Sequence, residues 1–428
     1  MNLKTTLATT IIETLYLKNR NFCSNDYDDC LDHISDIIPL NVHVYSDAHN
    51  SWQVPPKWNL KHAFIKNMND ITIYKADHPL KVIGLSSSYT GNVSRDELLK
   101  HLHYDHRFSD AIPYHFRQFY RPWERTWGFC VPRTFYNTLK DKTYFVHIAT
   151  EESNGTIKVA EHIKQGETPY TFTFVAHLDH PGMANDDLAG VAVGIELFKK
   201  LQNLQTKFTY KLLLVPEIIG SEFYLGLNKN KNLILESCFL EMLGSKTSLA
   251  LQRSQGTKSF IEKKLLESLS ELKIPFNEGP FKSIICNDEY IWESHQIPMC
   301  SLSRFPYKEY HTHFDNPSII SEHSLDESVN LLYQTILKLE KLTLIKKKFT
   351  GTPCFSHPTY NLYVDPGQRA FGTHANQEAQ NKRLLMDLIP AQKELFFLES
   401  ILERTSVCKK KSLTYLKMWE EKKLISIY

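Results

Sequence analysis

The spacing of apolar positions changes along the chain. Residues 9–19 have apolar positions at helical spacing and predict an opening helix. From about 40 to 130, short runs such as ITIYKA and LKVIGLSS alternate with Trp, Tyr, His and Pro, which predicts a small β-rich module. Within it, residues 94–103 predict a helix with Ser94 as N-cap and Glu97 three positions later.

From about residue 140 to 345, short apolar runs alternate with amphipathic stretches. The runs YFVHIA, TFTFVA and YKLLLV have strand length, and DLAGVAVGIELFKKLQNL, between the last two, has helical spacing. FIEKKLLESLSEL and SLDESVNLLYQTILKLEKLTLI predict further long helices. This alternation predicts an α/β fold, with a mixed, mostly parallel sheet sandwiched by helices.

The last part of the chain has a third pattern of apolar and polar residues. FFLESILER is followed by a polar break and by KKKSLTYLKMWEEKKLISIY, a basic amphipathic helix with a strand-like tail, which resembles a winged-helix module. Because Glu420 and Glu421 lie among the lysines, we expect this module to form a homo-oligomer and do not expect it to bind nucleic acid. The predicted domains are a discontinuous α/β domain (1–40 and 131–350), an inserted β-rich domain (41–130) and a winged-helix-like domain (351–428).

Composition narrows the class of protein. Of 428 residues, 42% are hydrophobic and 23% charged, which is typical of a globular protein. The net charge of +2 provides no electrostatic case for nucleic acid or a membrane surface. No apolar run approaches the ~18–20 residues that cross a bilayer, and Glu13 and the threonines interrupt any signal peptide. The scattered cysteines predict a reduced, cytoplasmic setting, with Cys238 as a core thiol.

Histidines and carboxylates occur where predicted strands end. His177 and Asp179 directly follow TFTFVA, and their side chains point the same way if the segment is extended. Asp186 comes just before the next helix. The carboxyl ends of strands in open α/β sheets bind ligands, and imidazole with carboxylate suits zinc.

Later strands end in the same way. Glu217 follows YKLLLV within PEIIGS, and His311 lies in EYHTHFD before another helix. Glu241 lies inside the apolar run SCFLEMLGS, where an unpaired carboxylate is costly and a cation removes that cost. A lone Asp or His in a loop is usually structural or solvated, so the prediction of a metal site depends on all four segments together.

The order of these motifs resembles that in a clan of zinc aminopeptidases with a phosphorylase/hydrolase-like fold. The motifs are H-x-D, N-D before a helix, Glu, L-[DE]-M-x-G and Y-H-T-x-x-D. The clan includes bacterial leucyl aminopeptidase, glutamate carboxypeptidase II and glutaminyl cyclase. More closely, the chain resembles a prokaryotic aminopeptidase-like branch with an inserted β-rich domain and a C-terminal winged helix. The resemblance covers nearly the whole chain and includes SWQVPPKWN, HPLKVIGLSSSYTGNVSRDELLKHLH, IPYHFRQFYRPWERTWGFC, AHLDHPGMANDDLAGV, PEIIGS, NDEYIW and SRFPYKEYHTHFDNPS.

The resemblance implies roles for six residues. One or two zinc ions would be held by a bridging carboxylate and three further ligands, a carboxylate would orient one ligand, and a general base would take a proton from the attacking water. His177 and Glu241 would hold one zinc, His311 would lie at a second position, Asp186 would bridge, Asp179 would orient His177, and Glu217 would be the base.

The chain departs from the di-zinc pattern at two positions. The di-zinc enzymes carry two adjacent glutamates, whereas here Pro216 precedes a single Glu217. Either the base or a second-metal ligand is missing, or Glu222 takes its place. Glu241 stands where those enzymes usually have Asp. One zinc and two zincs therefore both stay open, as does whether Glu217 is base or ligand.

Other residues are expected to lie near the metal site. Asp288, Arg304 and Tyr310 lie in the family-like motifs and are expected to bind substrate, with a structural ion pair as the alternative for Arg304. The aromatic residues of 113–127 either cover the site or form the module's core. We expect HLHYDH, residues 101–106, to be solvated surface. His180 and Asp187 are expected to be structural neighbours of the site.

The sequence thus predicts a zinc-dependent, aminopeptidase-like hydrolase that cleaves a small peptide or amide with metal-activated water. The aromatic inserted module leaves a second hypothesis open, an amidohydrolase or deacylase that acts on a small-molecule, sugar or amino-acid conjugate in a biosynthetic pathway. The missing glutamate and the C-terminal module leave a third, a catalytically silent binding or regulatory protein.

Overall fold

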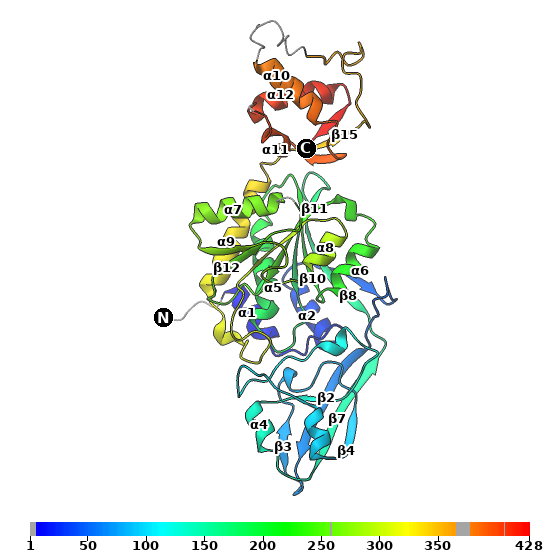
Figure 1. Ribbon diagram of the computed structural model, residues 1–428, viewed down its shortest axis with the longest axis vertical. Helices are drawn as coiled ribbons and strands as arrows, with labels where there is room; N and C mark the ends of the chain where they lie inside the picture. The colour runs from blue at the N-terminus through cyan, green and yellow to red at the C-terminus, as the bar shows by residue number, and fades with distance from the viewer. Residues whose placement is uncertain (1–5, 257–258, 365–376, 406) are drawn as a thin grey trace. The chain divides into compact units, whose positions relative to one another are not determined.

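The computed structural model describes residues 6–256, 259–364, 377–405 and 407–428. It divides into two compact units, Met1–Ile336 and Leu337–Tyr428 (Figure 1). None of the described helices is long and apolar enough to cross a membrane.

A large mixed sheet forms the centre of the first unit. Its central strands β10, β9, β11 and β14 run parallel, while β1, β8 and β12 pair antiparallel with their neighbours toward the two edges. Every residue of β9 is buried, as expected for a strand covered on both faces. The strand order is β1 (Asn41–Tyr45), β8 (Ile157–Lys164), β10 (Thr209–Val215), β9 (Thr171–His177), β11 (Ile234–Glu241), β14 (Met299–Ser303), β12 (Leu249–Gln252) and β13 (Phe276–Gly279).

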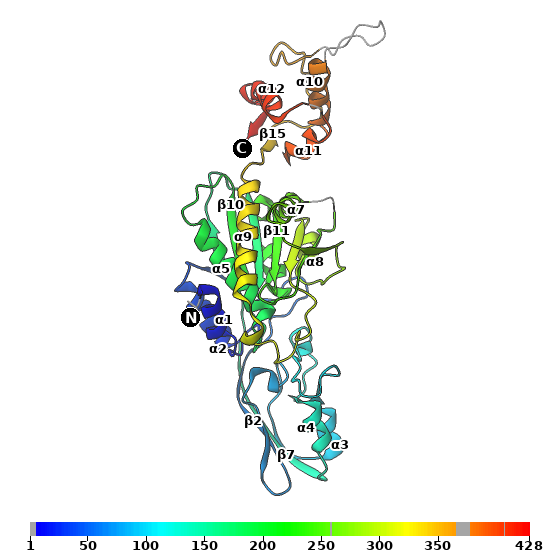
Figure 2. The ribbon, with the colours of Figure 1, turned by 90° about the vertical axis from the view of Figure 1, so that its left-hand side faces the viewer.

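Helices cover both faces of this sheet, which confirms the predicted mixed α/β fold (Figure 2). Helices α1 (Leu7–Leu15) and α5 (Gly190–Leu201) pack together on one face. Helix α7 (Phe260–Leu272) begins at the N-cap Ser259 and packs on β11 from the other face, beside α8 (Glu289–Ser294). Helices α2 (Asn25–Ser35) and α6 (Ile219–Leu227) also belong to this unit, and α9 (Glu322–Leu339) begins in it and continues into the second unit.

A smaller antiparallel sheet lies beyond the carboxyl end of the large one and has the order β3 (Thr72–Lys75), β2 (Lys57–Lys66), β7 (Thr143–Ser153) and β4 (Tyr89–Ser94) (Figure 1). Helix α3 (Arg95–Lys100) follows, and the predicted N-cap is confirmed because Ser94 Oγ accepts from Glu97 N at 3.1 Å. The same region contains β5 (Leu102–His103), β6 (Phe129–Cys130) and α4 (Arg133–Thr138).

Two expectations about this region differ from the structure. The run YFVHIA lies in β7 of the small sheet and not in the large one, so the small sheet extends past residue 130. Alternating burial along β7 marks a strand with one covered face, unlike the fully buried β9. The run LKVIGLSS forms no strand, because Pro79 starts a 3-10 turn and only Val82 makes an isolated bridge, to Phe129.

The second unit contains the predicted basic helix as α12 (Lys409–Glu421). Its sheet has β15 (Leu344–Lys347) between β16 (Leu395–Phe397) and β17 (Ile425–Ile427). Helices α10 (Gln377–Leu388) and α11 (Glu399–Leu402) complete it. The buried Trp419 packs against Phe355, with ring centroids 4.5 Å apart, so this unit has its own core. Residues 365–376 of the predicted C-terminal domain lie outside the described residues.

Candidate metal centre

The carboxyl ends of β9, β10 and β11 meet at one edge of the large sheet, and Asp187 ties two of them together. Its Oδ2 accepts from His177 N at 3.1 Å, while Oδ1 accepts from Gly190 N at 3.1 Å and from Met242 N at 2.7 Å. These bonds join the ends of β9 and β11 to the start of α5. Asp187 therefore has the structural part expected from the sequence.

A second buried carboxylate, that of Asp315, binds the backbone of the loop that leads to Asp186. Asp315 accepts backbone hydrogen bonds from three consecutive residues and from the hydroxyl of Tyr307 at 2.6 Å. Burial raises the pKa of Asp315 to about 6. The loop from β9 is thereby held against the loop that carries His311. The three backbone donors are Ala184 N, Asn185 N and Asp186 N, at 2.6–3.1 Å.

Arg20, which the sequence analysis missed, holds the other side of this loop. Its guanidinium is fully buried and donates to the carbonyls of Leu178 at 2.9 Å, Met183 at 3.1 Å and His180. Arg20 lies in the polar segment between α1 and α2, where its own surroundings carry no motif. Nothing local in the sequence therefore indicates that it supports the site.

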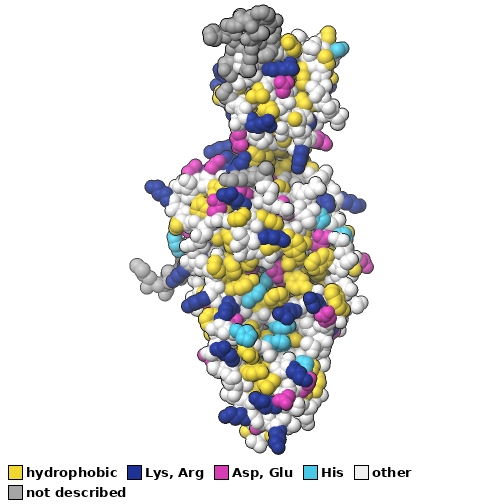
Figure 3. Space-filling view, in the orientation of Figure 1, with side chains coloured by type: hydrophobic (Ala, Val, Ile, Leu, Met, Phe, Trp, Pro, Cys, Tyr) yellow, Lys and Arg dark blue, Asp and Glu magenta, His cyan; other side chains and the backbone are white. Residues whose placement is uncertain are grey.

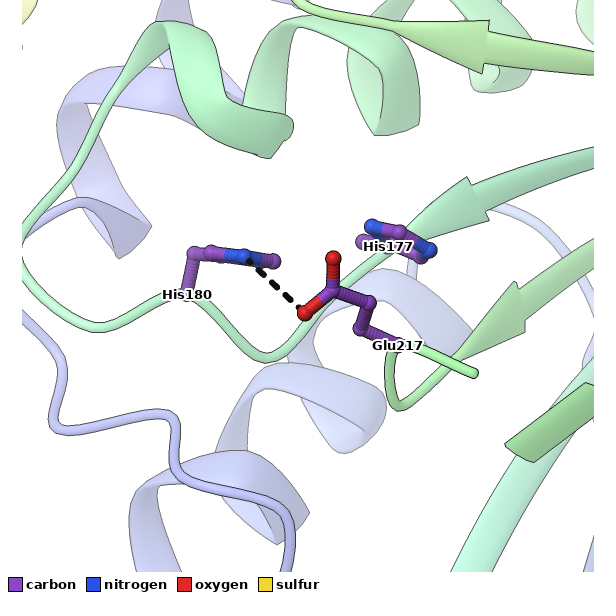
Figure 4. Close-up of side chains that lie close together, drawn as sticks. All are labelled: His177, His180 and Glu217. Carbon is purple, nitrogen blue, oxygen red and sulfur yellow. Dashed lines mark ion pairs between the residues drawn. The ribbon is translucent and has the colours of Figure 1, made fainter. Parts of the chain in front are cut away.

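Two overlapping clusters of metal-ligating side chains result, and His180 belongs to both. One contains His180, Asp186 and His311, and the other contains His177, His180 and Glu217. Within each cluster the ligand atoms all lie within 4.8 Å of one another. Figure 4 shows the Glu217 carboxylate between the rings of His180 and His177, with Oε2 3.8 Å from Nε2 of His180.

Charges in the first cluster favour an ionised carboxylate beside imidazoles. His311 Nε2 lies 3.2 Å from Asp186 Oδ2, and His180 Nε2 lies 3.9 Å from Asp186 Oδ1. Although burial opposes its ionisation, His180 and His311 lower the pKa of Asp186 to about 2. Burial likewise opposes protonation of His180, yet Asp186 and Asp179 raise its pKa above the usual value.

Several buried polar atoms around the clusters have no hydrogen-bond partner among the described residues. Leaving such atoms unpaired costs free energy, and a bound cation removes the cost by accepting their lone pairs. The donor set of imidazoles and carboxylates matches zinc. The residues present therefore fit a zinc ion. The unpartnered atoms include His177 Nδ1, His180 Nδ1, Asp179 Oδ2, Glu241 Oε2 and Asp288 Oδ1.

The carboxylate on His177 is not the expected one. His177 Nε2 lies 2.6 Å from Asp288 Oδ2, whereas Asp179, predicted to orient His177, accepts from Glu217 N at 2.9 Å. Asp288 was expected to bind substrate, but it is completely buried and also accepts from Ile218 N at 2.9 Å. Burial opposes protonation of His177, and Asp288 raises the pKa of the imidazole well above its usual value.

Glu241 lies outside both clusters. Its Oε1 accepts from the side-chain amide of Asn287, and burial, with Glu289 nearby, raises the pKa of Glu241 well above its usual value. Asn287 N in turn donates to Glu289 at 2.7 Å. Glu241 is thus a buried polar neighbour of the clusters, with Oε2 left unpartnered.

Two further expectations differ from the structure. Glu222 does not replace the missing second glutamate, because its carboxylate lies 3.1 Å from His295 and accepts from Asn50. Arg304, expected to bind substrate, has a nearly buried guanidinium that donates to Thr247 O at 2.8 Å and lies 2.6 Å from Glu327. The structural alternative for Arg304 is therefore the one observed.

Aromatic side chains of the inserted segment cover the clusters. The Tyr120 hydroxyl donates to Glu217 Oε2 at 2.7 Å, and Tyr114 lies beside both His180 and His311, with ring centroids 5.6 and 5.3 Å away. Tyr310, which was expected to bind substrate, stacks on His311, with ring centroids 3.8 Å apart. By contrast, Phe119 and Trp127 lie in the module's core, and His101 of HLHYDH stacks on Trp127 outside either cluster.

Three loops of the site place a non-glycine residue at positive φ: Ile218 at 64°, Met242 at 53° and His311 at 57°. For a β-branched residue such as Ile218 this conformation is sterically costly. The N–H groups of Glu217 and of Ile218 itself donate to Asp179 and Asp288, and these hydrogen bonds hold the turn in place. Such conformations concentrate at functional sites, where the surrounding structure imposes them.

Comparisons with known proteins agree with this fold. A family model described as "Domain of unknown function (DUF4910)" matches residues 9–342. A Clostridium acetobutylicum protein described as "Putative polysaccharide biosynthesis protein with aminopeptidase-like domain" is 28% identical over 345 residues, which is 77% of each chain.

Solved structures show the same architecture. A "putative peptidase" from Clostridium acetobutylicum superposes with a TM-score of 0.75 and 22% identity, over 98% of this chain and 96% of that chain. A zinc aminopeptidase from Bacillus subtilis superposes with a TM-score of 0.59 and 12% identity, over 78% of this chain and 94% of that chain. The chain therefore has the mixed α/β fold of aminopeptidase-like proteins.

Proposed function

The chain belongs to the family described as "Domain of unknown function (DUF4910)", and on that premise we propose that it is a zinc-dependent hydrolase of amide or peptide bonds. The observation that carries the proposal is the cluster of His180, Asp186 and His311 at the carboxyl ends of the parallel strands in the large mixed sheet. The chain shares its fold with a zinc aminopeptidase from Bacillus subtilis, and this likeness supports zinc-dependent hydrolysis.

We assign His180, Asp186 and His311 as the ligands of one zinc ion. His177 Nδ1 and Glu217 offer further ligand atoms beside His180, so a second ion stays open. When bound, zinc supplies a Lewis acid for the carbonyl and lowers the pKa of a water ligand to about 7. Glu241, which the resemblance implied as a ligand, supports the site through Asn287 in this proposal.

Glu217 is the proposed general base. Its carboxylate faces the cluster, and the Tyr120 hydroxyl holds Oε2 so that Oε1 stays free to take the proton of the attacking water. Asp179 and Asp288 fix the turn that carries Glu217 by accepting from its own N–H and that of Ile218. Tyr114 covers the imidazoles of His180 and His311 and limits the access of bulk water.

The default substrate is an N-terminal aminoacyl group. The second candidate is an amidohydrolase or deacylase that acts on a sugar or amino-acid conjugate, and the description of the Clostridium acetobutylicum relative as a polysaccharide biosynthesis protein supports it. A panel of aminoacyl amides and N-acyl small molecules distinguishes the two.

We also propose that the second unit is a winged-helix-like module that mediates self-association in the cytoplasm. The succession of α10, β16, α11, α12 and β17 around a three-stranded sheet supports the first part. The oligomeric state of the whole chain and of Leu337–Tyr428 expressed alone, compared by light scattering, tests the second.

Zinc content and turnover together test the main proposal. We expect about one or two zinc ions per chain, hydrolysis of at least one substrate class, and loss of turnover with retained zinc in Glu217→Gln. A chain that binds no zinc and hydrolyses nothing on the panel contradicts the proposal and favours a silent binding protein. Unchanged turnover in Glu217→Gln rejects the base assignment alone.

A further inference from the structure

A pocket of about 490 Å³ lies beside the metal centre, lined by residues 102–104, 106 and 113–117. Two of its lining side chains, Tyr114 and Phe116, also contact the candidate metal ligands. The Tyr114 ring centroid is 5.6 Å from that of His180, and the Phe116 centroid is 5.4 Å from that of His311. A group held in this pocket is therefore separated from the metal cluster by single aromatic side chains.

The lining of the pocket carries the positive charge of Arg117 and no negative charge. It contains Arg117 and three histidines, and no carboxylate is among the residues that line it. Figure 3 shows His side chains gathered on one face near the junction of the large and small sheets, with Lys and Arg around them. Burial, together with the neighbouring His115, lowers the pKa of His103 to about 4, so its imidazole is a neutral hydrogen-bonding group at pH 7.

Arg117 differs from the other arginines of this segment. Arg107 pairs with Asp105 at 2.8 Å, Arg121 pairs with Glu124 at 3.1 Å, and Arg125 pairs with Glu152. Within the described residues, the Arg117 guanidinium makes no hydrogen bond and no ion pair. The pocket thus contains one arginine whose planar fork is available to a ligand.

A second polar group of the pocket is also without a partner. Nδ1 of His115 is buried and has no hydrogen-bond partner among the described residues. The His115 ring packs against that of His103, with centroids 4.3 Å apart. An unpaired guanidinium and an unpaired imidazole nitrogen are chemically suited to a carboxylate or a phosphate, whose oxygens accept hydrogen bonds from such groups.

We propose that this pocket binds an oxyanion of the substrate, a carboxylate or a phosphate, through Arg117. The inference rests on the proposed hydrolase function in one respect, namely that the oxyanion belongs to the substrate. It narrows the substrate class to amides that carry a negative charge away from the bond to be cleaved. A neutral aminoacyl amide leaves Arg117 without its partner and is hydrolysed less efficiently.

Binding of two probe anions tests the pocket without any activity. Inorganic phosphate and succinate are titrated by calorimetry into the zinc-loaded full chain and into Arg117→Gln, with Arg121→Gln as matched control because Arg121 is exposed and outside the pocket. We expect at least one anion to bind the native chain, at least tenfold weaker binding in Arg117→Gln, and unchanged binding in Arg121→Gln. Which anion binds identifies the group as phosphate or carboxylate.

The outcomes separate this inference from the proposed function. Binding of neither anion, or equal weakening in both variants, overturns the inference. Binding that Arg117→Gln leaves unchanged shows that the anion binds outside this pocket and also overturns the inference. Arg117-dependent binding in a chain that hydrolyses nothing supports the pocket and contradicts the proposed hydrolase. Zinc content, equal in the three proteins, shows that the substitutions leave the metal centre intact.

Discussion

His177 Nε2 lies 2.6 Å from Oδ2 of Asp288, and both side chains are fully buried. The pair joins the end of β9 to the start of α8, and because Asp288 also accepts from Ile218 N, it fixes the turn that carries Glu217. A histidine that binds metal through one nitrogen commonly donates the other to a carboxylate. His177 has this form, since its Nδ1 is buried and unpartnered.

The shared position of His180 predicts unequal effects of two histidine substitutions. His180→Ala removes a ligand from both clusters, so we expect most of the bound zinc to be lost on dialysis, with affinity at least about 10-fold lower. His177→Ala leaves His180, Asp186 and His311 in place, so at least one ion is retained. Metal content by atomic emission spectroscopy measures both. The reverse pattern, with zinc lost only from His177→Ala, refutes the assignment of His180 as the central ligand.

Tyr120→Phe isolates the hydrogen bond to Glu217. Removing the hydroxyl leaves the carboxylate without the donor that holds it at 2.7 Å. We expect kcat to fall about 10-fold, which corresponds to roughly 1.4 kcal/mol, the order of one hydrogen bond to a charged group. KM and zinc content stay unchanged if Tyr120 acts by positioning Glu217. A rise in KM alone, with the native kcat, is inconsistent with this role.

Arg304→Ala affects stability and not substrate binding. The guanidinium is nearly buried and bonds to Thr247 O, Ser324 O and Glu327, so its removal leaves these groups with lost partners. We expect the free energy of unfolding to fall by about 2–3 kcal/mol in denaturant titrations, with KM unchanged. An increase in KM without loss of stability supports instead the substrate role expected from the sequence.

Stability depends on pH through Glu236, which accepts from Phe260 N and Ile261 N at the start of α7. Burial raises the pKa of Glu236 from 4.5 to about 7, so the folded state binds this proton more tightly than the unfolded state. Its contribution is fully present below pH 4.5 and is lost as pH rises to about 7, by up to ~3 kcal/mol.

Glu236→Gln tests this pH dependence, because glutamine does not ionise. We expect the free energy of unfolding of the native chain to decrease relative to that of the variant between about pH 4.5 and 7. Parallel pH profiles of native and variant exclude Glu236 as the titrating group.

Local interactions explain which elements were predictable. The N-cap of α3 depends on Ser94 and Glu97, three positions apart, and the fully buried strand β9 depends on an uninterrupted apolar run. The spacing of apolar residues within a strand does not specify which strands it pairs with. For this reason YFVHIA was predicted to lie in the large sheet, whereas it lies in β7 of the small one. The alternating burial of β7 reflects one covered face, a signal that its apolar and polar positions already carry.

The sequence by itself determined which side chains are available: imidazoles and carboxylates at the ends of strands, in an order that resembles that of zinc aminopeptidases. Only the tertiary structure decided which carboxylate meets which imidazole. His177 and Asp288 are 111 positions apart, so no spacing along the chain records their contact. The place of His180 in both clusters also depends on a distant residue, because Arg20 holds the loop that carries His180. Residue types are local properties, whereas burial and partners arise only when distant segments pack together.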